Sequence, residues 1–154
     1  MAADSAIAST WPPIPYRLAD VTLKVERIHG HGQPRQELTL FGGDRATLDQ
    51  QPGVRTVAVP QADVLRAVEG LYTMRFFDLA PEIGPRQSVF LKPDGVVGLQ
   101  LRRRSDVTTT RVCMAVTDYE KCVRMIEGDG PRELEDWVQT LFADMLQRFA
   151  TVKK

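Results

Sequence analysis

The strongest constraint on the fold is a long stripe of apolar residues at helical spacing near the C-terminus. The stripe follows Pro131, a residue that suits the first turn of a helix. Its members recur every three or four positions: Leu134, Trp137, Val138, Leu141, Phe142, Met145 and Phe149. A helix with one apolar face has to bury that face, so the rest of the chain must supply an apolar surface for it.

The first part of the chain supplies that surface as strands. Val21, Leu23 and Val25 alternate with polar residues, which is the period-two pattern of a strand with one buried face. Glycine-containing segments separate this strand from further short alternating runs. The expected strands cover residues 21–28, 37–40, 45–49 and 54–59. Together they predict an antiparallel meander.

The middle of the chain predicts a helix and then more strands. Apolar residues at helical spacing indicate a helix over residues 60–74, and a Pro93-Asp94-Gly95 turn indicates a hairpin over 88–103. A further strand is expected at 107–116. Thr117 followed by Glu120 is a capping-box pattern, which predicts a short helical turn through Cys122.

These elements predict the α+β class, as an antiparallel sheet with two amphipathic helices packed on one face. Residues 1–20 are expected to form a flexible N-terminal segment, and residues 21–150 a single domain.

Composition argues against two classes of partner. The chain has 154 residues, with 20 basic and 20 acidic side chains and no formal net charge. A protein that depends on binding nucleic acid or an anionic membrane surface is usually basic. No window of 18 apolar residues is present, so no membrane span is expected.

The N-terminus bears on the compartment. It lacks the basic and apolar regions of a signal peptide, but its small residues are typical of the start of a mature exported chain. We therefore expect a periplasmic or secreted protein. An ordinary cytoplasmic N-terminus is the alternative.

The order of features resembles a bacterial domain family of unknown function that occurs in exported proteins and lipoproteins. The matching positions are Arg27, Gly32, Pro34, residues 42–44, residues 76–79 and Pro131. The loop of that family usually carries two cysteines, whereas this chain has His29, His31 and Gln33 there. The resemblance therefore implies a fold and a compartment, and no activity.

The same loop holds the only two histidines, His29 and His31. Two imidazoles separated by one residue can converge on a metal ion, but a zinc site needs at least three protein ligands. Glu26 and Asp44 are the nearest candidates to complete it. A solvated glycine-rich loop without metal is the alternative, and we expect no cofactor.

The two cysteines, Cys113 and Cys122, are nine positions apart. A disulfide between a strand and the following helical turn can form if the Cα atoms come within about 7 Å. The alternative is two small buried hydrophobic side chains.

Arg102, Arg103 and Arg104 form a basic cluster at the end of the predicted hairpin. Such a cluster can enter an acidic cleft of another protein. The sequence therefore favours a non-enzymatic protein-binding domain with an unidentified partner, and one version of this prediction is an inhibitor or immunity-type protein. The oligomeric state is left open. The alternative function is a small metal-binding protein or enzyme centred on His29 and His31.

Overall fold

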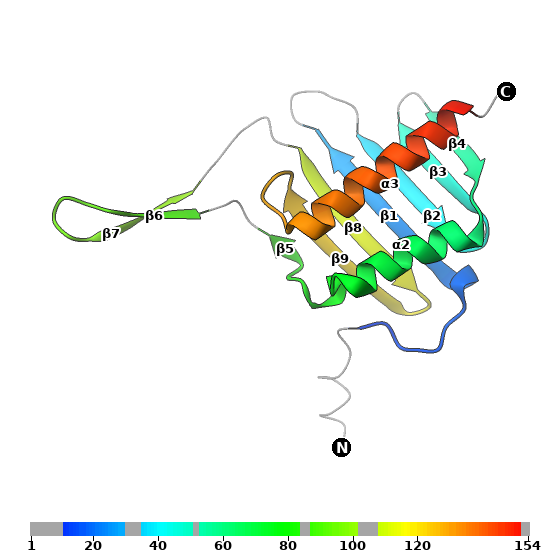
Figure 1. The fold of residues 1–154 in the computed structure, drawn as a ribbon, viewed down its shortest axis with the longest axis horizontal. Helices are drawn as coiled ribbons and strands as arrows, with labels where there is room; N and C mark the ends of the chain where they lie inside the picture. Colours follow the sequence, from blue (N-terminus) through cyan, green and yellow to red (C-terminus); the bar gives the residue numbers. More distant parts are fainter. Residues whose placement is uncertain (1–10, 30–34, 51–52, 84–86, 102–107, 152–154) are drawn as a thin grey trace, which may run out of the picture.

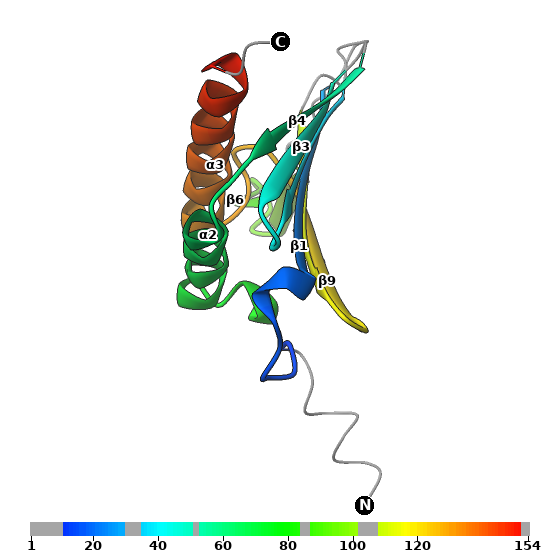
Figure 2. The ribbon, with the colours of Figure 1, turned by 90° about the vertical axis from the view of Figure 1, so that its right-hand side faces the viewer.

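One seven-stranded sheet and two helices make up the two layers of the structure, seen face-on in Figure 1 and edge-on in Figure 2. This computed structural model describes residues 11–29, 35–50, 53–83, 87–101 and 108–151. Both helices cover the same face of the sheet, and we call the opposite, uncovered face the open face. The predicted α+β class is confirmed.

The sheet contains β1 (Val21–Ile28), β2 (Gln36–Phe41), β3 (Arg45–Gln50), β4 (Gly53–Ala58), β5 (Glu82–Ile83), β8 (Thr109–Val116) and β9 (Tyr119–Ile126). The helices are α2 (Gln61–Thr73) and α3 (Arg132–Thr151), with the short 3-10 helices η1 (Leu18–Asp20) and η2 (Phe76–Asp78). The strand order is β4-β3-β2-β1-β8-β9-β5. All neighbours are antiparallel except β5, which runs parallel to β9 and makes the sheet mixed.

The core lies between the helices and the inward side chains of the central strands. Leu23 of β1 pairs with Leu40 of β2 on one side and with Met114 of β8 on the other, and all three are buried. The predicted stripe of α3 packs against this layer, with Trp137 only partly buried at its margin. The buried members of the stripe are Leu134, Val138, Leu141, Phe142, Met145 and Phe149. The C-terminal helix therefore finds the apolar surface that it requires.

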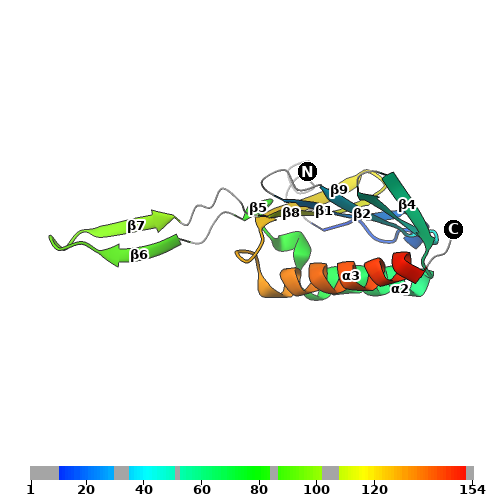
Figure 3. The ribbon, with the colours of Figure 1, turned by 90° about the horizontal axis from the view of Figure 1, so that it is seen from above.

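Two local predictions are wrong. Thr117 does not open a helical turn, because it lies in the tight turn of a β8–β9 hairpin, with a positive φ of 49°. The predicted hairpin does not join the main sheet. Its strands, β6 (Gln87–Leu91) and β7 (Val97–Leu101), form a separate two-stranded sheet that extends away from the body of the domain (Figures 1 and 3).

Residues 11–20 were expected to be flexible, but they contact the domain. The ring of Trp11 lies 5.1 Å from that of Phe77, and its indole N–H donates a 2.7 Å hydrogen bond to Asp78. The hydroxyls of Tyr16 and Tyr72 are 2.6 Å apart, and burial together with this hydrogen bond raises the pKa of Tyr16. The folded unit therefore begins before residue 21. Within the described residues, no helix is both long and apolar enough to cross a membrane.

The contact between Trp11 and Asp78 predicts a pH response. The indole hydrogen bond lowers the pKa of Asp78 below its ordinary 3.8. This contribution to stability is therefore present above about pH 3.8 and is lost as the pH falls through the lower folded-state pKa. In a Trp137→Phe background, we expect Trp11 fluorescence to stay constant down to about pH 4 and to change below it.

Asp78→Asn is the matched control, because it keeps an oxygen acceptor without a titrating charge. It should remove the fluorescence change. An unchanged acid response in the Asp78→Asn variant would show that another group controls the docking of Trp11.

Candidate interaction surfaces

The predicted metal loop is only partly within the described residues. His29 follows β1, and its Nδ1 and Nε2 lie 3.0 Å from Thr108 Oγ1 and 3.5 Å from Gln36 Oε1. His31 lies outside the described residues. Asp44 is in the turn at the opposite end of β1, roughly 25 Å of strand away, so its assignment to this loop is wrong.

The other suggested ligand, Glu26, is held by an ion pair. Its carboxylate lies 2.8 Å from the guanidinium of Arg35. Among the described residues, Cys113, Glu120 and Cys122 are the one group of three or more potential metal ligands whose donor atoms lie within 4.8 Å of one another. Both of these cysteines are engaged in a disulfide, so the thiolates that a metal would need are not available in this state.

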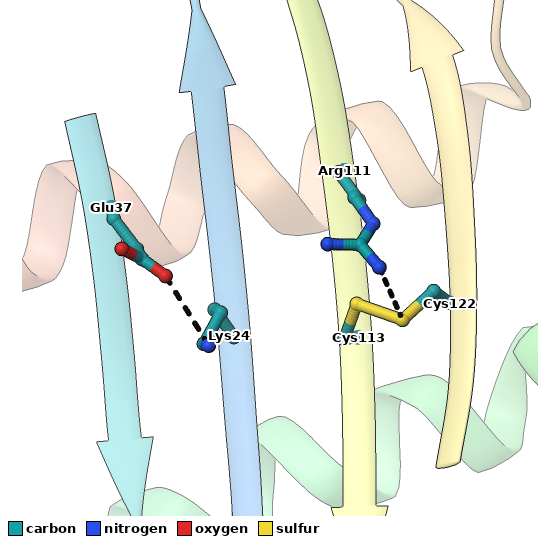
Figure 4. Close-up of a disulfide and its surroundings, with 5 residues drawn as sticks. All are labelled: Lys24, Glu37, Arg111, Cys113 and Cys122. Atoms are coloured by element: carbon teal, nitrogen blue, oxygen red, sulfur yellow. Dashed lines mark hydrogen bonds and ion pairs between the residues drawn. A yellow bond between two sulfur atoms is a disulfide. The ribbon is translucent and has the colours of Figure 1, made fainter. Parts of the chain in front are cut away.

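The disulfide joins Cys113 of β8 to Cys122 of β9. The two residues are directly opposite in the antiparallel ladder, with their Cα atoms 4.1 Å apart. Cys122 was expected on a helical turn, but it lies on a strand, because the ladder continues through this position. Figure 4 shows the bridge on the open face, beside Arg111 and with the Lys24–Glu37 ion pair on the neighbouring strands.

A row of charged residues crosses the open face next to the disulfide. Strand pairing places its members side by side on six successive strands: Glu82, Arg124, Arg111, Glu26, Glu37 and Asp49. We call this set the charged row. At the β1–β3 end of the charged row, Arg35 makes ion pairs with all three acidic residues, which are Glu26, Glu37 and Asp49.

The two arginines of the charged row have no such compensation. Arg111 and Arg124 are directly opposite each other on β8 and β9, and both are exposed. Over the part of the chain that the structure describes, neither has a carboxylate oxygen within 4.0 Å. The one side-chain partner of Arg111 there is Cys122 Sγ, at 3.5 Å. Like charges that face each other across a strand pair are destabilising.

The β6–β7 hairpin carries an apolar face. Val89 pairs with Leu99 and Leu91 pairs with Val97, so these four side chains share one side of the ribbon, which we call the hairpin face. They are 58–73% exposed. On the other side, the ring of Phe90 lies against Gly98, where a Cβ would come within 2.5 Å of it. Glycine at position 98 therefore lets Phe90 cover its own strand pair and leaves the aliphatic side unpartnered.

A groove runs between α2 and α3, with a volume of about 560 Å³. Its floor includes Ala67 and Trp137, and the indole of Trp137 donates a 3.1 Å hydrogen bond to the carbonyl of Ala67. One end is closed by ion pairs of Arg148 with Asp63 and Asp144. The groove is therefore partly occupied by the domain's own charged contacts.

The predicted basic cluster of Arg102, Arg103 and Arg104 lies outside the described residues, directly after β7. The sequence analysis did not identify the hairpin face or the charged row. Comparison of the chain with protein-family models, with curated proteins and with solved structures finds no match in any of the three.

Proposed function

We propose that this protein is a non-enzymatic protein-binding domain that inserts the β6–β7 hairpin into an apolar groove of another protein. The observation that carries the proposal is the hairpin face, on which four aliphatic side chains point into solvent at 58–73% exposure. An exposed group of apolar side chains of this kind is typical of interaction sites.

The isolation of the hairpin supports this proposal. A two-stranded ribbon is at best marginally stable in water unless something packs against its apolar face. The hairpin extends beyond β5 and away from both helices (Figure 3). A surface on another molecule would provide the missing layer.

The chemistry of the hairpin favours a protein groove over a lipid surface. Its tip carries Lys92 and Asp94, both exposed, and the Asp94 carboxylate accepts a 3.1 Å hydrogen bond from the amide of Val96. Inserting this tip into a bilayer would bury two charged groups at high cost. Sideways packing of the hairpin face into a groove leaves the tip in water.

The shape of the element fits steric occlusion. Each strand has five residues, so the ribbon is about 17 Å long and about 5 Å between its strands. A ribbon of this width can enter a cleft that the rest of the domain cannot. Arg102, Arg103 and Arg104 follow β7 directly in the sequence, and an acidic partner would attract their positive charge, as expected for an inhibitor.

We also propose that the protein works in the periplasm or outside the cell. The Cys113–Cys122 disulfide supports this location, because disulfides persist in oxidising compartments and are rare in the cytosol. The resemblance to a family of exported bacterial proteins favours the same location.

The quadruple variant V89T/L91T/V97T/L99T tests the hairpin face. Threonine keeps a high strand propensity while adding a hydroxyl, so the hairpin can form without its apolar face. Full-length wild-type and variant proteins would be immobilised and exposed to extract from the cells that naturally produce the protein. We expect at least tenfold weaker retention of the partner by the variant, because the aliphatic side chains no longer gain burial.

Val54→Thr is the matched control. Val54 is 62% exposed on edge strand β4 and lies outside the hairpin, so its replacement should leave retention unchanged. Equal retention by wild type and the quadruple variant would overturn the proposal. An equal loss of partner retention in the quadruple variant and in Val54→Thr would also overturn the proposal.

A further inference from the structure

We infer a second binding site on the open face, where Arg111 and Arg124 together bind a carboxylate of an acidic polypeptide. This inference does not rest on the hairpin, which belongs to a different sheet. It follows from the placement of the two arginines, from their lack of carboxylate partners and from the crosslink beside them.

The strand register places Arg111 and Arg124 directly opposite each other. Opposed residues in an antiparallel ladder alternate between a narrow pair, with Cα atoms about 4.5 Å apart, and a wide pair of about 5.5 Å. Cys113 and Cys122 form a narrow pair at 4.1 Å. Arg111 and Arg124 lie two positions further along each strand, so they are a narrow pair on the same face.

The neighbouring carboxylates do not compensate this positive charge. Glu26 is opposite Arg111 on β1, but its carboxylate lies 2.8 Å from Arg35. Glu82 is opposite Arg124 on β5, yet no ion pair forms between these two described residues within 4.0 Å. Two arginines therefore face each other in a position that costs stability, which is expected where side chains serve binding rather than folding.

The disulfide explains how the sheet tolerates the repulsion. It crosslinks β8 and β9 two residues from the arginine pair, so the strands cannot separate or slip in register at this point. Figure 4 shows Arg111 on the same face as the bridge, pointing toward Cys122. The crosslink thus holds the arginine pair in place.

The surroundings select the ligand. Each guanidinium group presents paired N–H donors that match a carboxylate or a phosphate, and the opposed arginines offer two such groups on one face. Glu82 and Glu26 flank the pair on both sides within the charged row. Glu26 is paired with Arg35, but the negative charge of Glu82 disfavours a dianionic phosphate more than a monoanionic carboxylate. The site therefore fits an aspartate or glutamate side chain on a partner polypeptide.

The test is a titration of the intact disulfide-bonded protein with an acetylated hexaglutamate peptide, followed by NMR of the arginine Nε–H groups. Hexaglutamine and inorganic phosphate are titrated in parallel. We expect the Arg111 and Arg124 signals to shift with hexaglutamate and not with hexaglutamine. We also expect R111Q/R124Q to bind hexaglutamate at least tenfold more weakly, and Arg132→Gln, on the exposed start of α3, to bind it as the wild type does.

A second readout separates binding from a structural role. Because the repulsion is removed, Arg124→Gln should unfold at the same temperature as the wild type or at a higher one. A lower unfolding temperature, or unchanged hexaglutamate binding by R111Q/R124Q, would overturn the site. Tighter binding of phosphate than of hexaglutamate would overturn the carboxylate assignment. The hairpin variant V89T/L91T/V97T/L99T should bind hexaglutamate normally, so failure of either proposal is recognised separately.

Discussion

Replacing Phe77 by alanine should destabilise the domain by about 3–5 kcal/mol. Its ring is 1% exposed and is surrounded by other aromatic rings. The ring centroids of Tyr72, Trp11, Phe76 and Tyr119 lie 4.9, 5.1, 5.5 and 6.1 Å from it. The truncation removes these contacts and leaves a cavity between the end of α2 and the sheet. Urea unfolding followed by circular dichroism measures the loss.

Phe90→Ala is the matched control for this change. Phe90 has the same side chain on the projecting hairpin, where it is 45% exposed and absent from the core cluster. Its removal should change the unfolding free energy of the domain by less than about 0.5 kcal/mol. If both variants lose the same stability, the hairpin is part of the folding unit, and the separation drawn between hairpin and core is wrong.

Removing the disulfide should cost about 2–3 kcal/mol, because the crosslink closes a short loop in the unfolded chain. Cys113 and Cys122 are separated by nine positions, which makes this loop entropy moderate. We expect the C113S/C122S variant and the reduced wild-type protein to show the same lowered midpoint in urea.

Dithiothreitol provides the control, since it should destabilise the wild type and leave C113S/C122S unchanged. A wild-type midpoint that does not respond to reductant under conditions where both thiols are free would contradict the stabilising role. It would also contradict the inference that the crosslink between β8 and β9 offsets the repulsion between Arg111 and Arg124.

The layers of the fold could be predicted because each depends on a local pattern. The stripe of α3 and the alternation of β1 are both visible within a single window of sequence, and each requires an apolar partner. Two amphipathic helices and a set of half-buried strands leave few ways to pack. The predicted two-layer arrangement follows from that restriction.

The region around Cys122 shows where a local pattern misleads. Thr117 and Glu120 match a capping box, but pairing of β9 with β8 over eight residues satisfies more backbone groups than one helical turn. The correct signal was present in the sequence. Val123 and Met125, which are both buried, alternate with the exposed polar residue Arg124.

The hairpin face could not be assigned from sequence. Val89, Leu91, Val97 and Leu99 alternate as the residues of a core hairpin do, and nothing in the pattern tells whether a helix covers them. The coverage depends on where α2 and α3 lie, and both cover the main sheet. The alternation of apolar residues therefore predicted that these four side chains are buried, whereas they are exposed in the structure.

The charged row could not be predicted from local sequence patterns either. Glu26 and Arg111 become neighbours only because β8 pairs with β1, across a separation of more than 80 residues in the chain. Of the predicted site residues, the two cysteines are brought together in a disulfide. His29 is hydrogen-bonded to Thr108 and Gln36. His31 and the cluster of Arg102, Arg103 and Arg104 lie outside the described residues.

A photo-reactive phenylalanine analogue at Val97 would test the role of the hairpin most directly. In extract from the cells that produce the protein, illumination should crosslink the hairpin face to a partner protein. The same analogue at Val54, exposed on β4, should give no crosslink to that protein. Equal crosslinking from both positions, or crosslinking from Val54 alone, would contradict binding through the hairpin.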